Sequence, residues 1–144
     1  MAATISCTML LRAFTVLMME RQSKRKPEAV LERGDIVLIP FPFTDLTTEK
    51  LRPAVIISVD PQRIDVIIAF ISSVVSPGEL SETDYLLHQD NPDFVKTGLK
   101  KTSTFRMRKL LTIERSRIIR RLGRVSPAIQ KELDIRLRQA VGLQ

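Results

Sequence analysis

Tryptophan is absent from this 144-residue sequence, which also has only one cysteine and one histidine. Because a disulfide or a cysteine-ligated zinc ion needs more than one thiol, Cys7 excludes both within a single chain. The lone His88 argues in the same way against a histidine-rich metal centre and against a Ser-His-Asp triad. We therefore expect no metal site and no cofactor, and the lack of disulfides fits a reducing, cytoplasmic environment.

A long apolar run is also absent. Residues 1–19 contain two apolar patches, which Arg12 separates. A membrane-spanning helix needs about 20 mostly apolar residues, and a signal peptide carries its positive charge ahead of the apolar core and a cleavage site after it. We expect neither here, and no membrane association. We interpret residues 1–30 as an N-terminal extension, either disordered or ahead of a true start at Met18 or Met19.

Acidic residues are outnumbered, with 16 Asp+Glu against 23 Lys+Arg, a net charge of +7 and a pI near 10.1. A chain this basic suits a polyanion: nucleic acid, an acidic protein segment or an anionic membrane surface. Most of the excess falls between Lys100 and Arg138, where only Glu114, Glu132 and Asp134 are acidic. Such arginines suit phosphate contacts, but a solvated surface explains them equally well, so charge alone leaves nucleic-acid binding open.

The length predicts one domain, residues 31–144, and the apolar pattern predicts mainly β structure. Apolar runs rich in β-branched residues and bounded by Gly, Pro and Asp predict strands at 36–39, 54–59 and 64–71. Residues 103–112 alternate apolar side chains with arginines, which predicts a half-buried strand with a basic outer face. Shorter strand signals occur at 85–87 and 118–122. Strands at this close spacing predict an antiparallel sheet or small barrel.

The last element is a predicted helix. Ser126 suits an N-cap and Pro127 the first helical position, and Gly142 is expected to end the helix. The apolar residues at helical spacing are Ile129, Leu133, Leu137, Ala140 and Val141. We expect this stripe to face the core or a partner.

The stretch Leu51–Ser58 joins a basic side chain to a strand. Pro53 is tolerated at the first residue of a strand and favours an extended conformation at Arg52. Ser72 and Ser73 end the following strand, and a hairpin register would bring them close to Arg52. Taken alone, an arginine before a strand is more often an ordinary surface residue, and two serines can simply end a strand.

A family resemblance rests on three segments that occur in this order: Arg33–Asp45, Leu51–Ser58 and Ile68–Ser73. Together they resemble the MazF/PemK family of toxin–antitoxin ribonucleases, particularly its PemK-like branch. The similarity continues through Thr97–Lys100, Lys109–Ile113 and the expected helix, so it covers about residues 31 to 143. Each segment alone is a weak signal, and the specificity comes from their order and spacing.

The resemblance implies a mainly β fold, an SH3-like antiparallel β-barrel of the kind that CcdB and PemK share, with a C-terminal helix. It implies a toxin, usually a homodimer, that cleaves single-stranded mRNA without a metal and so inhibits translation and growth. It also implies a cognate antitoxin protein that neutralises the toxin.

The same resemblance assigns site residues. Arg52 falls on the family's catalytic arginine and Ser72 on its catalytic threonine, so a hydroxyl is retained. The family's RNA-contacting loop corresponds to Phe43–Lys50. The residues that we expect to bind RNA are Phe43, Thr44, Lys50, Ser73, Lys100 and Arg106.

Metal-free cleavage uses the 2′-OH of the substrate as nucleophile, so the protein must align it and stabilise charge on the pentacoordinate phosphate. The rigid fork of Arg52 suits that task, although a guanidinium is a poor general base; the resemblance implies an acid/base role as well. Ser72 would orient the phosphate or the 2′-OH. Asp35 is expected to be structural, and Phe41 and Phe43 either stack on bases or pack in the core or a dimer contact.

Two alternatives stay open. The first is a gyrase poison resembling CcdB, which shares the barrel but binds a protein. Poisons of this kind look dependent on a tryptophan near the C-terminus, and this chain has no tryptophan. The second is a catalytically silent RNA-binding barrel, which serine in place of threonine at Ser72 leaves open.

Overall fold

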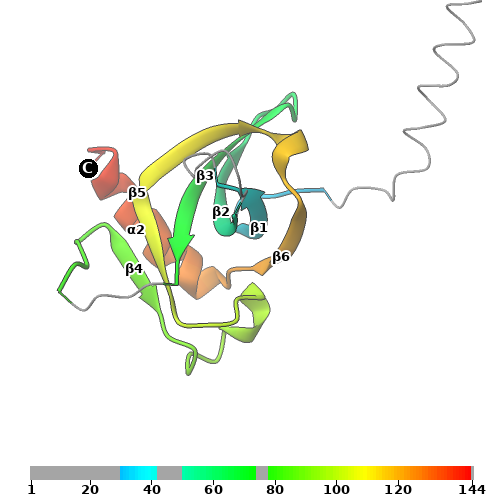
Figure 1. Cartoon of the computed structure of the whole chain (residues 1–144). Coiled ribbons are helices and arrows are strands. Elements are labelled where there is room, and N and C mark those ends of the chain that lie inside the picture. Colours follow the sequence, from blue (N-terminus) through cyan, green and yellow to red (C-terminus); the bar gives the residue numbers. More distant parts are fainter. Residues whose placement is uncertain (1–29, 42–49, 74–77, 144) are drawn as a thin grey trace, which may run out of the picture. The chain divides into compact units, whose positions relative to one another are not determined.

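The computed structural model describes residues 30–41, 50–73 and 78–143 (Figure 1). Chain contacts group Leu31–Gln144 as one unit. The predicted N-terminal extension, residues 1–30, lies outside the described residues except for Val30, so its separate character stays a prediction.

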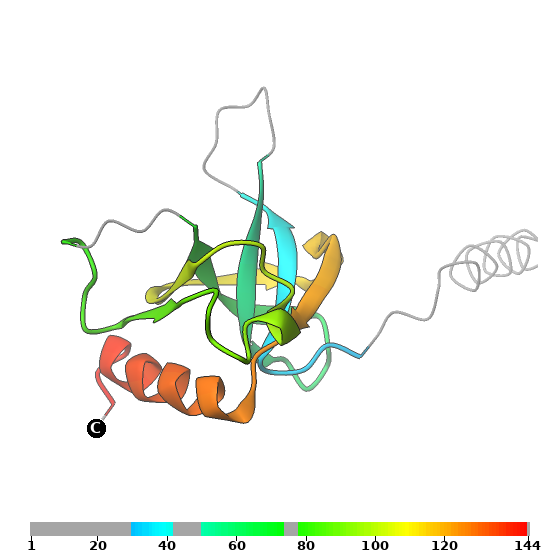
Figure 2. The ribbon, with the colours of Figure 1, turned by 90° about the horizontal axis from the view of Figure 1, so that it is seen from below.

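Six strands make up the described sheet, in the spatial order β4-β5-β3-β2-β1-β6, and every neighbouring pair is antiparallel. Their bounds are β1 (Asp35–Pro40), β2 (Leu51–Val59), β3 (Asp65–Ser72), β4 (Asp84–Leu87), β5 (Ser103–Glu114) and β6 (Arg120–Arg124). The sheet curls into a half-barrel, and the helix α2 (Pro127–Ala140) lies across one of its faces (Figure 2). The predicted mainly β fold with a C-terminal helix is confirmed.

Register shifts account for the curl, because an extra residue in one strand bends the ladder and increases its twist. One shift falls between Ile36 and Val37 where β1 meets β6, and another between Ile56 and Ser58 where β2 meets β3. A third falls in the β3–β5 ladder beside Phe70. This third shift shapes the candidate site described below.

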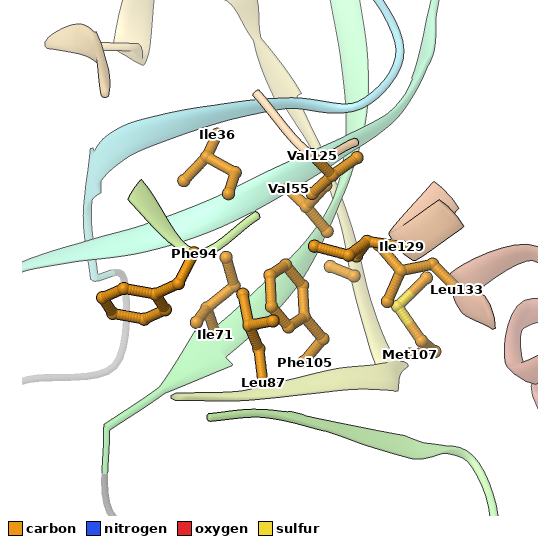
Figure 3. Close-up of a cluster of buried hydrophobic side chains, with 11 residues drawn as sticks. Ile36, Val55, Ile71, Leu87, Phe94, Phe105, Met107, Val125, Ile129 and Leu133 are labelled. Atoms are coloured by element: carbon orange, nitrogen blue, oxygen red, sulfur yellow. The ribbon is translucent and has the colours of Figure 1, made fainter. Parts of the chain in front are cut away.

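The first hydrophobic core lies between the sheet and α2 (Figure 3). Its fully or nearly buried members are Ile36, Val55, Ala69, Ile71, Leu87, Phe94, Phe105, Met107, Val125, Ile129 and Leu133. Burying a side chain of this size contributes about 1.5–3 kcal/mol. This core therefore fastens the helix to all the strands from β1 to β5.

The helix begins as its sequence predicts. The Ser126 Oγ accepts a hydrogen bond from the Ile129 N–H at 3.3 Å, and Pro127 occupies the first turn. Leu133 is buried beside Ile129, but Val141 is 48% exposed, so the predicted apolar stripe is wrong at its last residue. The reason is that the helix ends at Ala140, and Val141 already leaves the helical path.

The second core lies on the opposite face of the sheet, because neighbouring residues of a strand point to opposite faces. Its buried members are Val37, Ile39, Ala54, Ile56, Val66 and Ile68. Phe70 and Leu111 pack against its margin. The central strands are thus apolar on both faces, which explains why they read as continuous apolar runs rather than alternating ones.

Two predicted strand bounds are wrong. β2 starts at Leu51 rather than at residue 54, so Pro53 lies inside the strand and faces Leu38 of β1. The predicted strand at 118–122 starts only at Arg120, because the 3-10 turn η2 (Arg115–Arg117) comes first.

The short 3-10 turn η1 (Val95–Thr97) was not predicted, and it packs closely against β6. Gly98 follows it with φ +72°, and a Cβ there would lie 2.2 Å from the Leu122 carbonyl oxygen. A Cβ on Gly123 would lie 2.4 Å from the Lys96 carbonyl oxygen. Two glycines therefore allow these backbones to touch.

We predict that Gly98→Ala lowers the free energy of unfolding by about 2–4 kcal/mol, since it adds a backbone clash to the strain of a positive φ. Gly142→Ala is the matched control, because Gly142 has φ +75° but nothing within 4 Å of an added Cβ. Gly142→Ala should lower the free energy of unfolding by only about 1 kcal/mol. Urea unfolding of both variants measures the difference, and equal losses would contradict the close packing of η1 on β6.

Candidate active site

The ladder between β2 and β3 ends before either strand does. Their pairing stops at Ala54 opposite Phe70, yet β2 continues along β1 to Leu51 and β3 continues along β5 to Ser72. The next residue of β2 is Pro53, which has no N–H to donate to a ladder. An opening therefore forms between the two strand ends, and we call it the fork.

Arg52 and Ser72 both lie at the fork and line the same pocket. Continuing the register of Ala54 and Phe70 by two residues sets Arg52 opposite Ser72. Arg52 also pairs with Ile39, a member of the second core, so its side chain lies on that face of the sheet. The predicted approach of Ser72 to Arg52 is confirmed.

The fork contains a pocket of about 430 Å³, here called the fork pocket. Its polar lining side chains are Arg52, Ser72, Arg106 and Lys109. Its apolar lining residues are Phe41, Phe70, Ile71, Leu110 and Leu111. The pocket thus combines an apolar floor with three cationic groups and a hydroxyl.

A wide bulge in β5 brings Arg106 and Lys109 into the same pocket. Ala69 pairs with Leu110 but the next residue, Phe70, pairs with Arg106, so Met107–Lys109 have no partner on β3. In a regular strand, residues three apart point to opposite faces. The bulge removes that restriction.

Arg106 and Arg108 were predicted to share one basic outer face, and their surroundings differ. Arg106 is half-buried and lines the fork pocket, whereas Arg108 lies exposed on the bulge. The cause is again the bulge, which interrupts the alternation of β5 directly after Arg106.

Among the described residues, an aromatic ring rather than a carboxylate contacts the Arg52 guanidinium. The Cζ atom of Arg52 lies 4.7 Å from the centroid of the Phe41 ring. Phe41 in turn meets Phe70 edge to face, with centroids 5.4 Å apart and an interplanar angle of 71°. The Nε of Arg52 is buried and has no hydrogen-bond partner in the described part of the chain.

The cations of the fork pocket have no acidic partner in the part of the chain that the structure describes. Within the described ranges, Arg52, Arg106 and Lys109 form no ion pair. Asp84 is the Cα partner of Arg106, but its Oδ2 accepts a hydrogen bond from the Ser81 N–H instead. The pocket therefore has a positive potential that suits an anionic ligand.

Several arginines elsewhere in the described part of the chain form ion pairs. The ion pairs are Arg33 with Asp134, Arg121 with Asp35, Arg124 with Glu32, and Arg136 with Glu132. Asp35 is almost fully buried and also accepts the Glu32 N–H at 2.9 Å. This agrees with the structural role expected for Asp35.

The other predicted RNA contacts lie around the fork pocket. Lys50 and Ser73 line an adjoining pocket of about 340 Å³, which Arg52 shares. Lys100 lines a third pocket, of about 460 Å³, together with Ser73. Each pocket thus shares a residue with the next.

Phe43 and Thr44 lie outside the described residues, so their predicted RNA contacts stay predictions.

Sequence reasoning missed Lys109 and Phe70 as residues that line the fork pocket. The apolar positions in β5 carry a signal, because the spacing from Phe105 to Met107 is two residues but from Met107 to Leu110 it is three. Within a strand, a spacing of three residues between apolar side chains, instead of two, indicates a bulge.

His88 lies outside the fork pocket, exposed and 3.2 Å from Asp90. Among residues 30–41, 50–73 and 78–143, no cluster of three or more His, Cys, Asp or Glu side chains could hold a metal ion. No helix in the same ranges is long and apolar enough to cross a membrane.

A model of the family described as PemK-like, MazF-like toxin of type II toxin-antitoxin system matches residues 32–141. The match covers most of the chain, and the chain therefore belongs to this family. A search of curated protein sequences finds no significant match.

Several solved structures are similar. An endoribonuclease from a mycobacterial species, in complex with its cognate antitoxin, has a TM-score of 0.59 and 19% identity, covering 80% of this chain and 98% of its own. The Mycobacterium tuberculosis toxin MazF-mt6 has a TM-score of 0.59 and 18% identity, and the match covers 76% of this chain and 98% of that toxin. A MazE-MazF structure from Deinococcus radiodurans has a TM-score of 0.60 and 17% identity, and the match covers 81% of this chain and 100% of the matched chain. The fold is that of MazF toxins.

We predict that Arg106→Met leaves the free energy of unfolding unchanged or raises it by up to about 1 kcal/mol. The buried Nε of Arg106 has no hydrogen-bond partner among the described residues, and such a group costs about 1–3 kcal/mol. The control is Arg121→Met, which leaves the buried carboxylate of Asp35 without its cation and should lose about 1–3 kcal/mol. Urea unfolding distinguishes them. If Arg106→Met lowered the free energy of unfolding as much as Arg121→Met, the prediction would be contradicted, because Arg106 would then stabilise the fold.

Proposed function

We propose that the protein is a metal-independent endoribonuclease that cleaves single-stranded mRNA in the cytoplasm. The observation that carries the proposal is the fork pocket, where Arg52, Arg106 and Lys109, without an acidic partner among the described residues, share the lining with Ser72. Membership of a toxin family supports it, as do similar mycobacterial structures that are named endoribonucleases. The toxin would block translation by destroying its template.

The reaction is an attack of the 2′-OH on the adjacent phosphorus. The bond from phosphorus to the 5′ oxygen breaks, leaving a 2′,3′-cyclic phosphate on one product and a 5′-OH on the other. Negative charge builds on the non-bridging oxygens in the transition state. We assign Arg52 to these oxygens, since its guanidinium offers parallel N–H donors at a fixed spacing. A donor of this kind contributes about 100- to 1,000-fold in rate.

Ser72 has the role of aligning the reacting groups. Its hydroxyl, opposite Arg52, can donate to a phosphoryl oxygen or accept from the 2′-OH, and either contact restricts the attack to one geometry. We assign Arg106 and Lys109 to binding the RNA backbone, where cations supply affinity without reading the bases.

The RNA strand would leave the fork pocket through the adjoining pocket and continue into the third. The adjoining pocket offers Lys50 and Ser73, and the third offers Lys100 and Lys101. The shared lining residues place these pockets side by side, and we assign them to successive parts of one RNA strand.

We further propose that the protein works as a homodimer and that a cognate antitoxin protein neutralises it. The similar mycobacterial structure is a complex with its cognate antitoxin, and the Deinococcus structure is named MazE-MazF. A net charge of +7 suits an acidic inhibitor that competes with RNA. A gyrase poison is not favoured, because nothing in the family match or the similar structures points to gyrase.

The test is cleavage of long single-stranded RNA in excess EDTA. We predict that the wild-type protein cleaves the RNA under these conditions. Arg52→Ala should lower the cleavage rate by about 100-fold or more, and Ser72→Ala by about 10-fold or more. Ser72→Thr keeps the hydroxyl and should remain active. Arg138→Ala, an exposed change on α2, serves as the control and should match the wild type.

Three outcomes would count against the proposal. Wild-type activity that EDTA abolishes contradicts the metal-free reaction. Full activity in Arg52→Ala removes the site assignment. Tight RNA binding with no cleavage by any form of the protein would identify a silent RNA-binding barrel instead.

A further inference from the structure

The Arg52 guanidinium raises a question of orientation. An arginine side chain has many rotamers, and fixing it usually takes a carboxylate or several hydrogen bonds. Among the described residues Arg52 has no ion pair, and its Nε is buried without a hydrogen-bond partner. The contact that the structure does contain is with Phe41, whose ring centroid lies 4.7 Å from Cζ.

The Phe41 ring is itself held in place. Its edge-to-face contact with Phe70 fixes it to β3, with centroids 5.4 Å apart. Its backbone N–H donates to the Lys50 carbonyl at 2.9 Å, which ties the end of β1 to the start of β2. Phe41 is therefore linked to β3 through its ring and to the residue before β2 through its backbone.

A ring and a carboxylate hold a guanidinium with different consequences. A carboxylate would neutralise the charge and occupy the N–H donors that a phosphate needs. The negative face of an aromatic ring attracts the flat face of the cation and leaves the N–H groups at its edge available. Aromatic contact thus orients the cation without competing with the substrate.

We propose that Phe41 is a positioning residue, whose ring holds the Arg52 guanidinium in the fork pocket before substrate binds. This inference rests on the proposed function for its kinetic consequence, but the contact itself can be measured without RNA. Phe70 holds the ring through their edge-to-face contact. Phe41 therefore acts on the reaction through Arg52.

The first measurement is made on the free protein. NMR spectra of the arginine Nε–Hε groups are recorded, with the Arg52 signal assigned by its loss in Arg52→Lys. We expect a ring-current shift of this signal that disappears in Phe41→Leu and persists in Phe41→Trp. An Arg52 signal that is the same in wild type and Phe41→Leu would overturn the proposal, whether or not the protein cleaves RNA.

The second measurement is kinetic. Phe41→Leu should lower kcat by roughly 2- to 30-fold with little change in KM, because a cation–π contact of 0.5–2 kcal/mol corresponds to that range. Phe41→Trp keeps a π face and should recover most of the rate. Replacing Phe41 by phenylalanines with one, two and three ring fluorines should lower kcat stepwise, since each fluorine weakens the negative face at nearly constant volume.

Phe105 provides the matched control, because it is fully buried in the first core and does not line the fork pocket. The same fluorinated series at Phe105 should leave kcat unchanged. A rate that is insensitive to fluorination at Phe41 would assign the ring a packing role and overturn the proposal. A wild-type protein that cleaves no RNA would refute the proposed function, while the arginine spectra would still decide the contact.

Discussion

The early end of the β2–β3 ladder is the constraint on which the site depends. Each strand remains held on its outer side, β2 by β1 and β3 by β5, so the two ends stay rigid although they no longer pair with each other. Pro53 sits where the next ladder bond would form and has no N–H to offer. Arg52 and Ser72 are thereby presented from rigid elements but remain accessible, which is what a catalytic pair requires.

The arginines of the fork pocket differ from those that form ion pairs within the fold. Arginines that stabilise the fold have acidic partners, as Arg121 has in the buried Asp35. The cations of the fork pocket have none in the described part of the chain, and two of them contain a buried Nε without a hydrogen-bond partner. Such groups lower stability, and the two hydrophobic cores offset this loss. Functional sites commonly carry such local destabilisation.

Local sequence patterns predicted much of the fold. Apolar β-branched runs identified the central strands, and Ser126 with Pro127 identified the start of α2, because strand burial and helix capping are local properties. The resemblance to a family identified Arg52 and Ser72, and the register brings them together. Their catalytic roles stay predictions.

What sequence reasoning missed depends on register between distant segments. The β5 bulge arises from how β5 pairs with β3, and it alone brings Lys109 beside Arg106. The contact of Phe41 with Arg52 joins the end of one strand to the start of the next, and no periodicity within either strand reveals it. The close approach of η1 to β6 likewise follows from glycines in two separate segments.

The most direct measurement uses one RNA oligonucleotide in two forms, identical except that the second lacks the 2′-OH at the cleaved position. The account predicts that the first is cut to a 2′,3′-cyclic phosphate and a 5′-OH end, and that the second resists cleavage there. Equal cleavage of both forms would contradict it, because the nucleophile would then not be the substrate's own hydroxyl.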